Sequence, residues 1–264
     1  MSKIGFIGCG NMGSALARAA AKSDATIYLS DCDENKVSQL STEIGGIVST
    51  NAEIANICDY IFLGVKPQMM EETLLGIKNE LVLRADRFVL VSMAAGLKIE
   101  KINNFAGGVY PIIRIMPNTP CGVGSGMILY ATENVTQNEE QNFLNAMAKS
   151  GTFDKIPESL IDAGSVVSGC GPAFVCQFVE ALAEGGIAAG LSYDKALLYA
   201  ATTLEGTARL ILESGEHPEV LKDRVCSPGG STIEGVRRLE NGAFRGDVID
   251  AVIAAYKRTK ELGK

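Results

Sequence analysis

The chain has 264 residues, of which 47% are hydrophobic and 21% charged, a composition typical of an ordinary globular protein. Its formal net charge of −7, without a block of like charges, argues against binding to nucleic acids or to a membrane surface. No apolar run has transmembrane length and the first residues lack a signal-peptide pattern, so we expect a cytoplasmic protein. This length is at the upper limit for one hydrophobic core, which favours two domains.

Strand and helix patterns alternate in the first half of the chain. Strands are predicted at residues 3–8, 26–30, 46–49, 60–65, 88–92 and 112–116, and helices at 11–22 and 34–44. Such an alternation is typical of a parallel sheet covered by helices on both faces. Two further strands, predicted at 127–130 and 152–156, are expected to extend the sheet at its edge.

After about residue 160, helical patterns replace the strands. Helices are predicted at residues 172–189, 193–213, 232–241 and 245–261. The many Ala and Gly residues between 179 and 208 allow helices to approach closely, and a helical layer this thin leaves apolar faces uncovered. We therefore predict an α/β domain at 1–162, followed by an all-α domain at 163–264 that forms a homodimer.

A glycine motif lies between the first predicted strand and the first predicted helix. Residues 8–13 read Gly-Cys-Gly-Asn-Met-Gly, the G-x-G-x-x-G pattern of dinucleotide-binding domains. In this pattern Gly8 permits a tight turn, Gly10 lets the backbone approach a pyrophosphate, and Gly13 lets the helix pack closely on the sheet. The motif in this context predicts a Rossmann-type domain that binds a dinucleotide through Ile7, Gly8, Cys9, Gly10, Asn11 and Met12.

Asp31 follows the second predicted strand, eighteen residues after Gly13. An acidic residue there usually accepts hydrogen bonds from the ribose hydroxyls of NAD, and it repels the 2′-phosphate of NADP. The alternative is that Asp31 caps the helix that starts at Glu34. Lys36 is the nearest cation and no arginine follows closely, so the sequence allows NADH and leaves NADPH open.

Two more segments are expected to contact the cofactor, because they follow parallel strands at the edge where ligands bind in such sheets. The first contains Val65, Lys66 and Pro67, and the second contains Met93, Ala94 and Ala95. The small side chains of the second segment leave space for a nicotinamide ring. Lys66 either binds the cofactor or is simply solvated.

Residues 227–232, Ser-Pro-Gly-Gly-Ser-Thr, lie between two predicted helices. Proline and two glycines prevent regular structure, so hydroxyls and backbone N–H groups become available at the start of the following helix. A helix N-terminus of this kind suits a small carboxylate. The alternatives are that Thr232 is only the cap of that helix and that Ser227 is a turn residue.

Several motifs resemble those of the pyrroline-5-carboxylate reductase family. They are IGFIGCGNMG at the start, GVKPQ at 64–68, SMAAG at 92–96, RIMPNTP at 114–120, SGCGPAF at 168–174 and HPEVLKDRVCSPGGSTIEGVRRLE at 217–240. The last segment is the specific one, because the others also occur loosely in other Rossmann-type reductases. The resemblance covers nearly the whole chain.

The resemblance implies reduction of Δ1-pyrroline-5-carboxylate to L-proline with NADPH or NADH, the last step of proline synthesis. It implies a homodimer formed by the C-terminal helices, and the dimers of the family often assemble into decamers. It places the substrate on Glu158, Ser227, Gly230, Ser231 and Thr232, with Thr232 as the catalytic residue near the ring nitrogen. Asn51 matches a cofactor contact, whereas Asp31 falls where relatives carry a Ser or Thr.

Hydride transfer to a protonated cyclic imine needs no strong base, which agrees with a chain that has a single histidine. The seven cysteines show no C-x-x-C pair, so we expect reduced thiols and no metal site. A β-hydroxyacid dehydrogenase of the 6-phosphogluconate type would need a lysine within residues 168–182, and none is present. A deazaflavin-dependent NADP reductase would not explain residues 217–240, and a non-catalytic nucleotide sensor would bind the cofactor without turnover.

Overall fold

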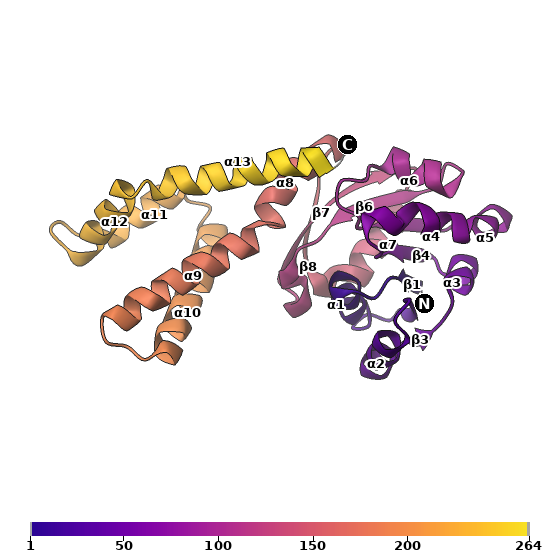
Figure 1. The fold of residues 1–264 in the computed structure, drawn as a ribbon, viewed down its shortest axis with the longest axis horizontal. Coiled ribbons are helices and arrows are strands. Elements are labelled where there is room, and N and C mark those ends of the chain that lie inside the picture. Colours follow the sequence, from indigo (N-terminus) through magenta and orange to yellow (C-terminus); the bar gives the residue numbers. More distant parts are fainter. Residues whose placement is uncertain (1, 263–264) are drawn as a thin grey trace. The chain divides into compact units, whose positions relative to one another are not determined.

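The computed structural model describes residues 2–262, and the chain divides into two compact units (Figure 1). The first unit combines residues up to Cys170 with the end of the chain from Tyr256 onward. The second comprises Gly171–Ala255. The domain boundary predicted at 162/163 lies inside a helix, Glu158–Ser168.

The first unit contains one eight-stranded sheet. Its strands are β1 (Lys3–Ile7), β2 (Thr26–Ser30), β3 (Ile47–Val48), β4 (Tyr60–Leu63), β5 (Val89–Ser92), β6 (Ile112–Met116), β7 (Gly126–Glu133) and β8 (Gly151–Lys155). The strand order is β3-β2-β1-β4-β5-β6-β7-β8, and all neighbours are parallel except β6 and β7. The order therefore reverses between β1 and β4, the point at which open α/β sheets bind nucleotides.

Helices cover both faces of this sheet, as the sequence predicts (Figure 1). They are α1 (Asn11–Ala20), α2 (Glu34–Ile44), α3 (Asn51–Ile57), α4 (Met70–Gly76), α5 (Lys78–Leu83), α6 (Ile99–Ala106), α7 (Gln137–Met147) and α8 (Glu158–Ser168), with short 3₁₀ turns η1 (Pro67–Met69), η2 (Thr119–Val123) and η3 (Ala148–Ser150). Side chains alternate along each strand, so Phe6 and Phe62 pack with α1, α2 and α7, whereas Ile7 and Leu63 pack with α3–α6 and α8. The two hydrophobic layers hold the strand ends in fixed positions.

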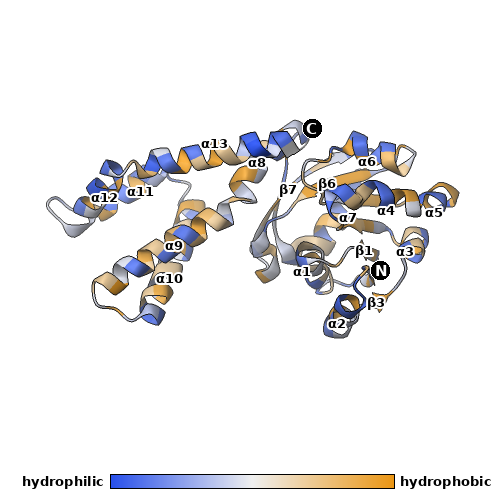
Figure 2. Ribbon diagram, in the orientation of Figure 1, coloured by the Kyte–Doolittle hydropathy of each residue, from blue (hydrophilic) through white to orange (hydrophobic). Residues whose placement is uncertain are grey.

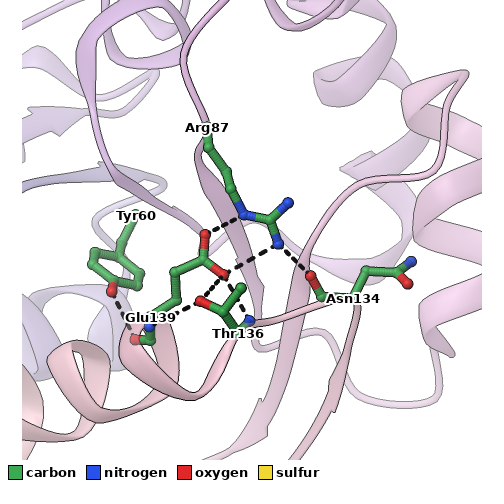
Figure 3. Close-up of polar contacts among 5 residues, drawn as sticks. All are labelled: Tyr60, Arg87, Asn134, Thr136 and Glu139. Carbon is green, nitrogen blue, oxygen red and sulfur yellow. Dashed lines mark hydrogen bonds and ion pairs between the residues drawn. The ribbon is translucent and has the colours of Figure 1, made fainter.

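A polar cluster fixes α7 at the edge of the sheet where β4 and β5 begin (Figure 3). Thr136 and Glu139 form a capping box at the start of α7, each side chain bonding the backbone N–H of the other. Arg87 pairs with the Glu139 carboxylate and donates to the Asn134 carbonyl, and the Tyr60 hydroxyl donates to the Glu139 carbonyl. This cluster lies at the edge opposite the glycine motif and has a structural role.

The second unit is entirely helical. Its elements are α9 (Gly171–Ala188), α10 (Tyr193–Ser214), α11 (Pro218–Val225) and α12 (Ser231–Asn241), and α13 (Phe244–Leu262) continues from it into the first unit. Helices α9 and α10 pack side by side through Ala183, Ala196 and Ala200, with Gly186 against Ala196 (Figure 1). The small residues allow the close approach that the sequence predicts.

Hydrophobic residues recur along the ribbons of α9, α10 and α13 (Figure 2). Many large apolar side chains of this unit are exposed in the single chain. They include Val175, Leu182, Ile187, Leu198, Leu210, Leu212, Ile249 and Ile253. One stretch of the described residues, Glu158–Ala188, is apolar and long enough to cross a membrane by length and composition, although no such run was expected from the sequence. A turn at Gly169 and Cys170 divides this stretch into α8 and α9.

Candidate functional site

The glycine motif forms the tight connection between β1 and α1. Gly8 has φ of +99°, and a side chain at this position would meet the backbone of Gly64 at 2.6 Å. Only glycine fits this turn, because the residue that follows the adjacent strand β4 lies directly against it. Gly10, by contrast, has no neighbouring atom within 4 Å of where its Cβ would be, so the backbone there is open to a ligand. These residues form a cradle that fits the pyrophosphate of a dinucleotide.

Asp31 is hydrogen-bonded to the glycine motif from the end of β2. Its Oδ2 accepts from the Cys9 backbone N–H at 2.6 Å, and its Oδ1 accepts from the Asp33 N–H at 3.0 Å. Asp33, and not Asp31, caps α2, because its carboxylate accepts from the Lys36 N–H. The structure thus contradicts the reading in which Asp31 caps this helix. Asp31 instead connects the end of β2 to the glycine motif.

The other predicted cofactor residues also lie at the carboxyl ends of strands. Val65, Lys66 and Pro67 follow β4, and Met93, Ala94 and Ala95 follow β5. Asn51 begins α3, and its side-chain oxygen accepts from the Ser30 hydroxyl at the end of β2 at 2.7 Å. The structure brings these segments, with Ile7–Met12 and Asp31, to one edge of the sheet around the β1–β4 switch point.

A cavity of 620 Å³ lies beside the glycine motif. Cys9, Gly10, Asn11 and Met12 line it, together with residues of α1, α2 and η2 that include Arg18, Lys36, Leu40, Glu43 and Thr119. Its volume falls in the range of small-molecule and cofactor sites. The cavity extends from the motif to the side of α2 that carries Lys36, Gln39, Leu40 and Glu43.

The Ser227–Thr232 loop belongs to the second unit, and its last two residues are the first two of α12, which begins at Ser231. Gly229 has φ of +69°, and Gly230 donates its backbone N–H to the Ser227 carbonyl at 3.0 Å. Gly230 occupies the cap position and provides no side-chain cap, so Thr232 stands one residue inside the helix and is not its cap. The cap reading of Thr232 is therefore wrong, and no side chain caps the N-terminus of this helix.

Glu158 takes part in a buried ion-pair network. Arg114, on β6, is 2% exposed and donates to Glu158 Oε1 at 3.1 Å and to Asp162 Oδ1 at 3.2 Å. Glu158 Oε1 also accepts from the Ile99 backbone N–H at 2.7 Å, which satisfies the start of α6. Lys260, near the end of α13, lies 3.8 Å from Asp162. Glu158 thus has a structural role beside any contact with substrate, and its carboxylate remains partly exposed.

The remaining sequence expectations concern single side chains. His217 caps α11, since its Nδ1 accepts from the Glu219 N–H at 3.2 Å, which confirms a structural histidine. All seven cysteines are free thiols, three of them buried. Burial raises the pKa of the Cys9 thiol to about 11, with a further increase from Asp31, so this thiol in the glycine motif is protonated at neutral pH. No cluster of three His, Cys, Asp or Glu side chains within residues 2–262 is suited to a metal ion.

The chain is similar to known proteins over nearly its whole length. A reductase of Escherichia coli named pyrroline-5-carboxylate reductase is 39% identical, over 99% of this chain and 98% of that protein. One of Pisum sativum with the same name is 38% identical, over 98% of this chain and 95% of that protein. The chain belongs to the pyrroline-5-carboxylate reductase family.

Family models and solved structures agree with this membership. The model of the pyrroline-5-carboxylate reductase dimerisation domain matches residues 158–262, and that of coenzyme F420-dependent NADP oxidoreductases matches residues 3–96. The second match covers only the nucleotide-binding part of the chain. The 217–240 segment is matched by the dimerisation model of the reductase family alone. Among solved structures, the pyrroline-5-carboxylate reductase of Coxiella burnetii has a TM-score of 0.90 at 29% identity, covering 100% of this chain and 99% of that one. The pyrroline carboxylate reductase of Plasmodium falciparum with NADP bound has a TM-score of 0.86 at 32% identity, covering 100% and 98%.

Two structural features were missed in the sequence. Arg114 interrupts an apolar strand, Ile-Ile-Arg-Ile-Met, and a charged residue in a buried strand is itself a signal of a partner elsewhere in the fold. Asp33 was missed as the cap of α2 because Asp31, two residues earlier, has the same side chain. In both cases the residue type was informative, and only the fold identifies the partner.

Proposed function

We propose that this protein reduces Δ1-pyrroline-5-carboxylate to L-proline with NADH or NADPH. The observation that carries the proposal is that the same chain has a glycine-rich turn suited to a dinucleotide in the first unit and the Ser227–Thr232 segment at the start of α12 in the second. Membership in the family, with about 38% identity to curated reductases over the whole chain, supports the same reaction. The activity belongs to the oxidoreductases that act on CH–NH groups.

The cofactor is proposed to bind along the edge formed by the carboxyl ends of the strands. The residues proposed to hold it are Ile7, Gly8, Cys9, Gly10, Asn11, Met12, Asp31, Asn51, Val65, Lys66, Pro67, Met93, Ala94 and Ala95. When bound, the reduced nicotinamide supplies a hydride to the imine carbon. The small side chains after β5 leave room for the ring, and the backbone at Gly10 leaves room for the pyrophosphate.

The substrate carboxylate is proposed to bind at the N-terminus of α12. Ser227 and Ser231 would donate hydrogen bonds there, Gly230 would line the site with its backbone, and the helix dipole favours a negative charge. Thr232 would donate to or orient the ring nitrogen, as the catalytic residue, and Glu158 would contribute from α8. A threonine hydroxyl is too weak an acid to drive the reaction alone, so its role is to position and to pass a proton through water.

The helices of the second unit are proposed to form a homodimer, and dimers to associate further into decamers. Large apolar side chains along α9, α10 and α13 are exposed in the single chain, and the dimerisation model covers residues 158–262. A second copy would cover these side chains, which a soluble monomer rarely exposes in such number. This surface, rather than contact with a lipid bilayer, accounts for the apolar Glu158–Ala188 stretch. We propose a cytoplasmic enzyme with residues 163–264 as its substrate-binding and dimerisation domain.

Turnover tests the reaction directly. Oxidation of NADH and of NADPH is followed by the loss of nicotinamide absorbance in the presence and absence of pyrroline-5-carboxylate. Correctly folded protein that oxidises neither cofactor would overturn the proposed reaction. Sedimentation without detergent tests the dimer: a monomer at micromolar concentration, or protein recovered only with membranes, would contradict it.

The role of Thr232 has its own test. Thr232→Ala should lower kcat/KM by about 10- to 100-fold, the scale of one or two lost hydrogen bonds to the reacting ligand. Thr232→Ser keeps the hydroxyl and serves as the matched control, so it should retain most of the activity. Equal kinetics of Thr232→Ala and the unchanged protein would remove Thr232 from the site.

A further inference from the structure

We propose that this enzyme discriminates against NADPH in favour of NADH, and that Asp31 is the residue that determines the choice. The inference rests on the proposed nicotinamide-dependent reduction and specifies which of the two cofactors is used. It follows from the hydrogen bonds of Asp31 and from the charges around the cavity beside the glycine motif.

The Asp31 carboxylate can accept one more hydrogen bond, and its negative charge repels an anion. A carboxylate offers about four acceptor positions. Three are taken: Oδ2 accepts from the Cys9 N–H at 2.6 Å, and Oδ1 accepts from the Asp33 N–H at 3.0 Å and the Cys32 thiol at 3.4 Å. The free position on Oδ2 suits a ribose hydroxyl, which can donate. A 2′-phosphate offers only acceptor oxygens and a like charge, so it is repelled there.

Asp31 carries this charge at neutral pH. Partial burial pushes the pKa of the Asp31 carboxyl upward, but the backbone N–H groups of Asp33 and Cys9 outweigh that effect and the pKa lies below its usual value. The backbone bonds also hold the carboxylate in place, so it cannot rotate away from an incoming phosphate without losing them. The discrimination is therefore built into the connection between β2 and the glycine motif.

Both cations that line the cavity are already paired with carboxylates. Arg18 forms two hydrogen bonds with Glu43, at 2.6 and 2.7 Å, and Lys36 Nζ lies 3.2 Å from Asp33 Oδ2. In both pairs a carboxylate already offsets the charge of the cation, so neither cation offers a 2′-phosphate an uncompensated positive charge. Accommodation of NADP usually relies on an arginine beside the ribose, and here the one arginine of the cavity is engaged in a bidentate pair.

The NADP-bound relative from Plasmodium falciparum does not oppose this inference. It is 32% identical to this chain, and the choice between the two cofactors depends on the few side chains around the end of β2. The local hydrogen bonds and charges of this chain are therefore the better guide to its preference.

Cofactor binding without substrate provides the test. The full-length protein is titrated with NADH and with NADPH, and binding is followed by nicotinamide fluorescence and by calorimetry. We expect the dissociation constant of NADH to be about 10- to 100-fold lower, the scale of one or two repulsive charge contacts in a partly shielded site. Because no substrate is present, this result is independent of whether pyrroline-5-carboxylate is the molecule reduced.

Two variants of Asp31 and one control separate charge from structure. Asp31→Asn removes the charge and keeps an acceptor for the Cys9 N–H, and Asp31→Ser also shortens the side chain. Both should bring the ratio of the two dissociation constants close to one. Asp24→Ser is the matched control, because Asp24 precedes β2 at the opposite end of the strand and should leave the ratio unchanged.

The outcomes are distinct. A preference for NADH that is lost in Asp31→Asn while the melting temperature is maintained supports the inference, even if Asp31→Ser fails to fold. Equal or tighter binding of NADPH by the unchanged protein overturns it, as does a preference that persists in Asp31→Asn. If the preference for NADH holds and pyrroline-5-carboxylate is not reduced, only the proposed reaction fails.

Discussion

Substitutions of Gly8 and Gly10 should affect different properties: Gly8→Ala should lower the stability of the protein, whereas Gly10→Ala should weaken cofactor binding. Gly8→Ala places a Cβ 2.6 Å from the Gly64 carbonyl carbon and forces a φ of +99° on a residue with a side chain. The backbone strain costs about 1–3 kcal/mol and the overlap with the main chain about as much again. We therefore expect Gly8→Ala to lower the free energy of unfolding by about 2–6 kcal/mol, a large part of the total stability of a domain.

Gly10→Ala should behave in the opposite way. Gly10 has φ of −66° and ψ of −171°, which alanine adopts freely, and its Cβ would meet no atom within 4 Å. The variant should be as stable as the unchanged protein, or more stable by up to about 1 kcal/mol, because alanine restricts the unfolded chain. Its Cβ would occupy the space of the pyrophosphate, so we expect cofactor affinity to fall by about 10- to 100-fold.

Urea denaturation and titration with NADH measure the two effects independently. The assignment of the glycine motif as a cofactor cradle requires that Gly10→Ala lose binding and keep its unfolding midpoint. A Gly10→Ala protein that binds NADH normally would refute that assignment. A Gly8→Ala protein with an unchanged midpoint would refute the steric argument for the turn.

Three further predictions concern stability. Arg114→Met leaves Glu158 and Asp162 without their buried partner, so the free energy of unfolding should fall by about 3 kcal/mol; a loss below about 1 kcal/mol in urea denaturation would show that the network contributes little. Thr136→Ala removes the cap of α7 and should cost about 1 kcal/mol, whereas Thr136→Ser should restore most of the loss; equal melting temperatures of all three proteins would contradict this. Burial raises the pKa of Tyr60 from its usual value of about 10 to about 12. The contribution of Tyr60 to the free energy of unfolding is therefore complete below about pH 10 and is lost as the pH rises toward about 12. Denaturation between pH 9 and 12 should therefore show a smaller decline for Tyr60→Phe, and parallel declines would exclude this role.

Much of the first unit could be predicted from local patterns. The strands at 26–30 and 112–116 and the helix at 34–44 have the predicted bounds, because apolar runs and turn residues define them locally. Helix α12 begins at Ser231, one residue before its predicted start, and ends at the predicted residue, Asn241; the glycines before it mark where it begins. These elements are defined by residues that lie close together in the sequence.

The short helices between the strands had no predicted bounds. Helices α4 and α5 have seven and six residues and meet at Ile77, too few turns for a clear apolar periodicity. A signal for α3 was present, since Thr50 and Glu53 form a capping box with the T-x-x-E spacing. The same spacing, Thr136 and Glu139, marks α7. Partners such as Arg114 and Glu158 are 44 residues apart and could be paired only by the folded sheet.

The division of the chain has a consequence for how the protein can be dissected. Because the end of α13 belongs with the sheet, through contacts such as that of Lys260 with Asp162, the helical unit is an insertion with two covalent connections to the rest. After one cleavage in a loop of that unit, each of the two resulting fragments carries one of the two parts of the nucleotide-binding unit. Removal of the last residues from Tyr256 would therefore weaken the nucleotide-binding unit, although those residues lie at the far end of the sequence. Limited proteolysis should yield a stable nucleotide-binding core only when the C-terminal fragment stays associated with it.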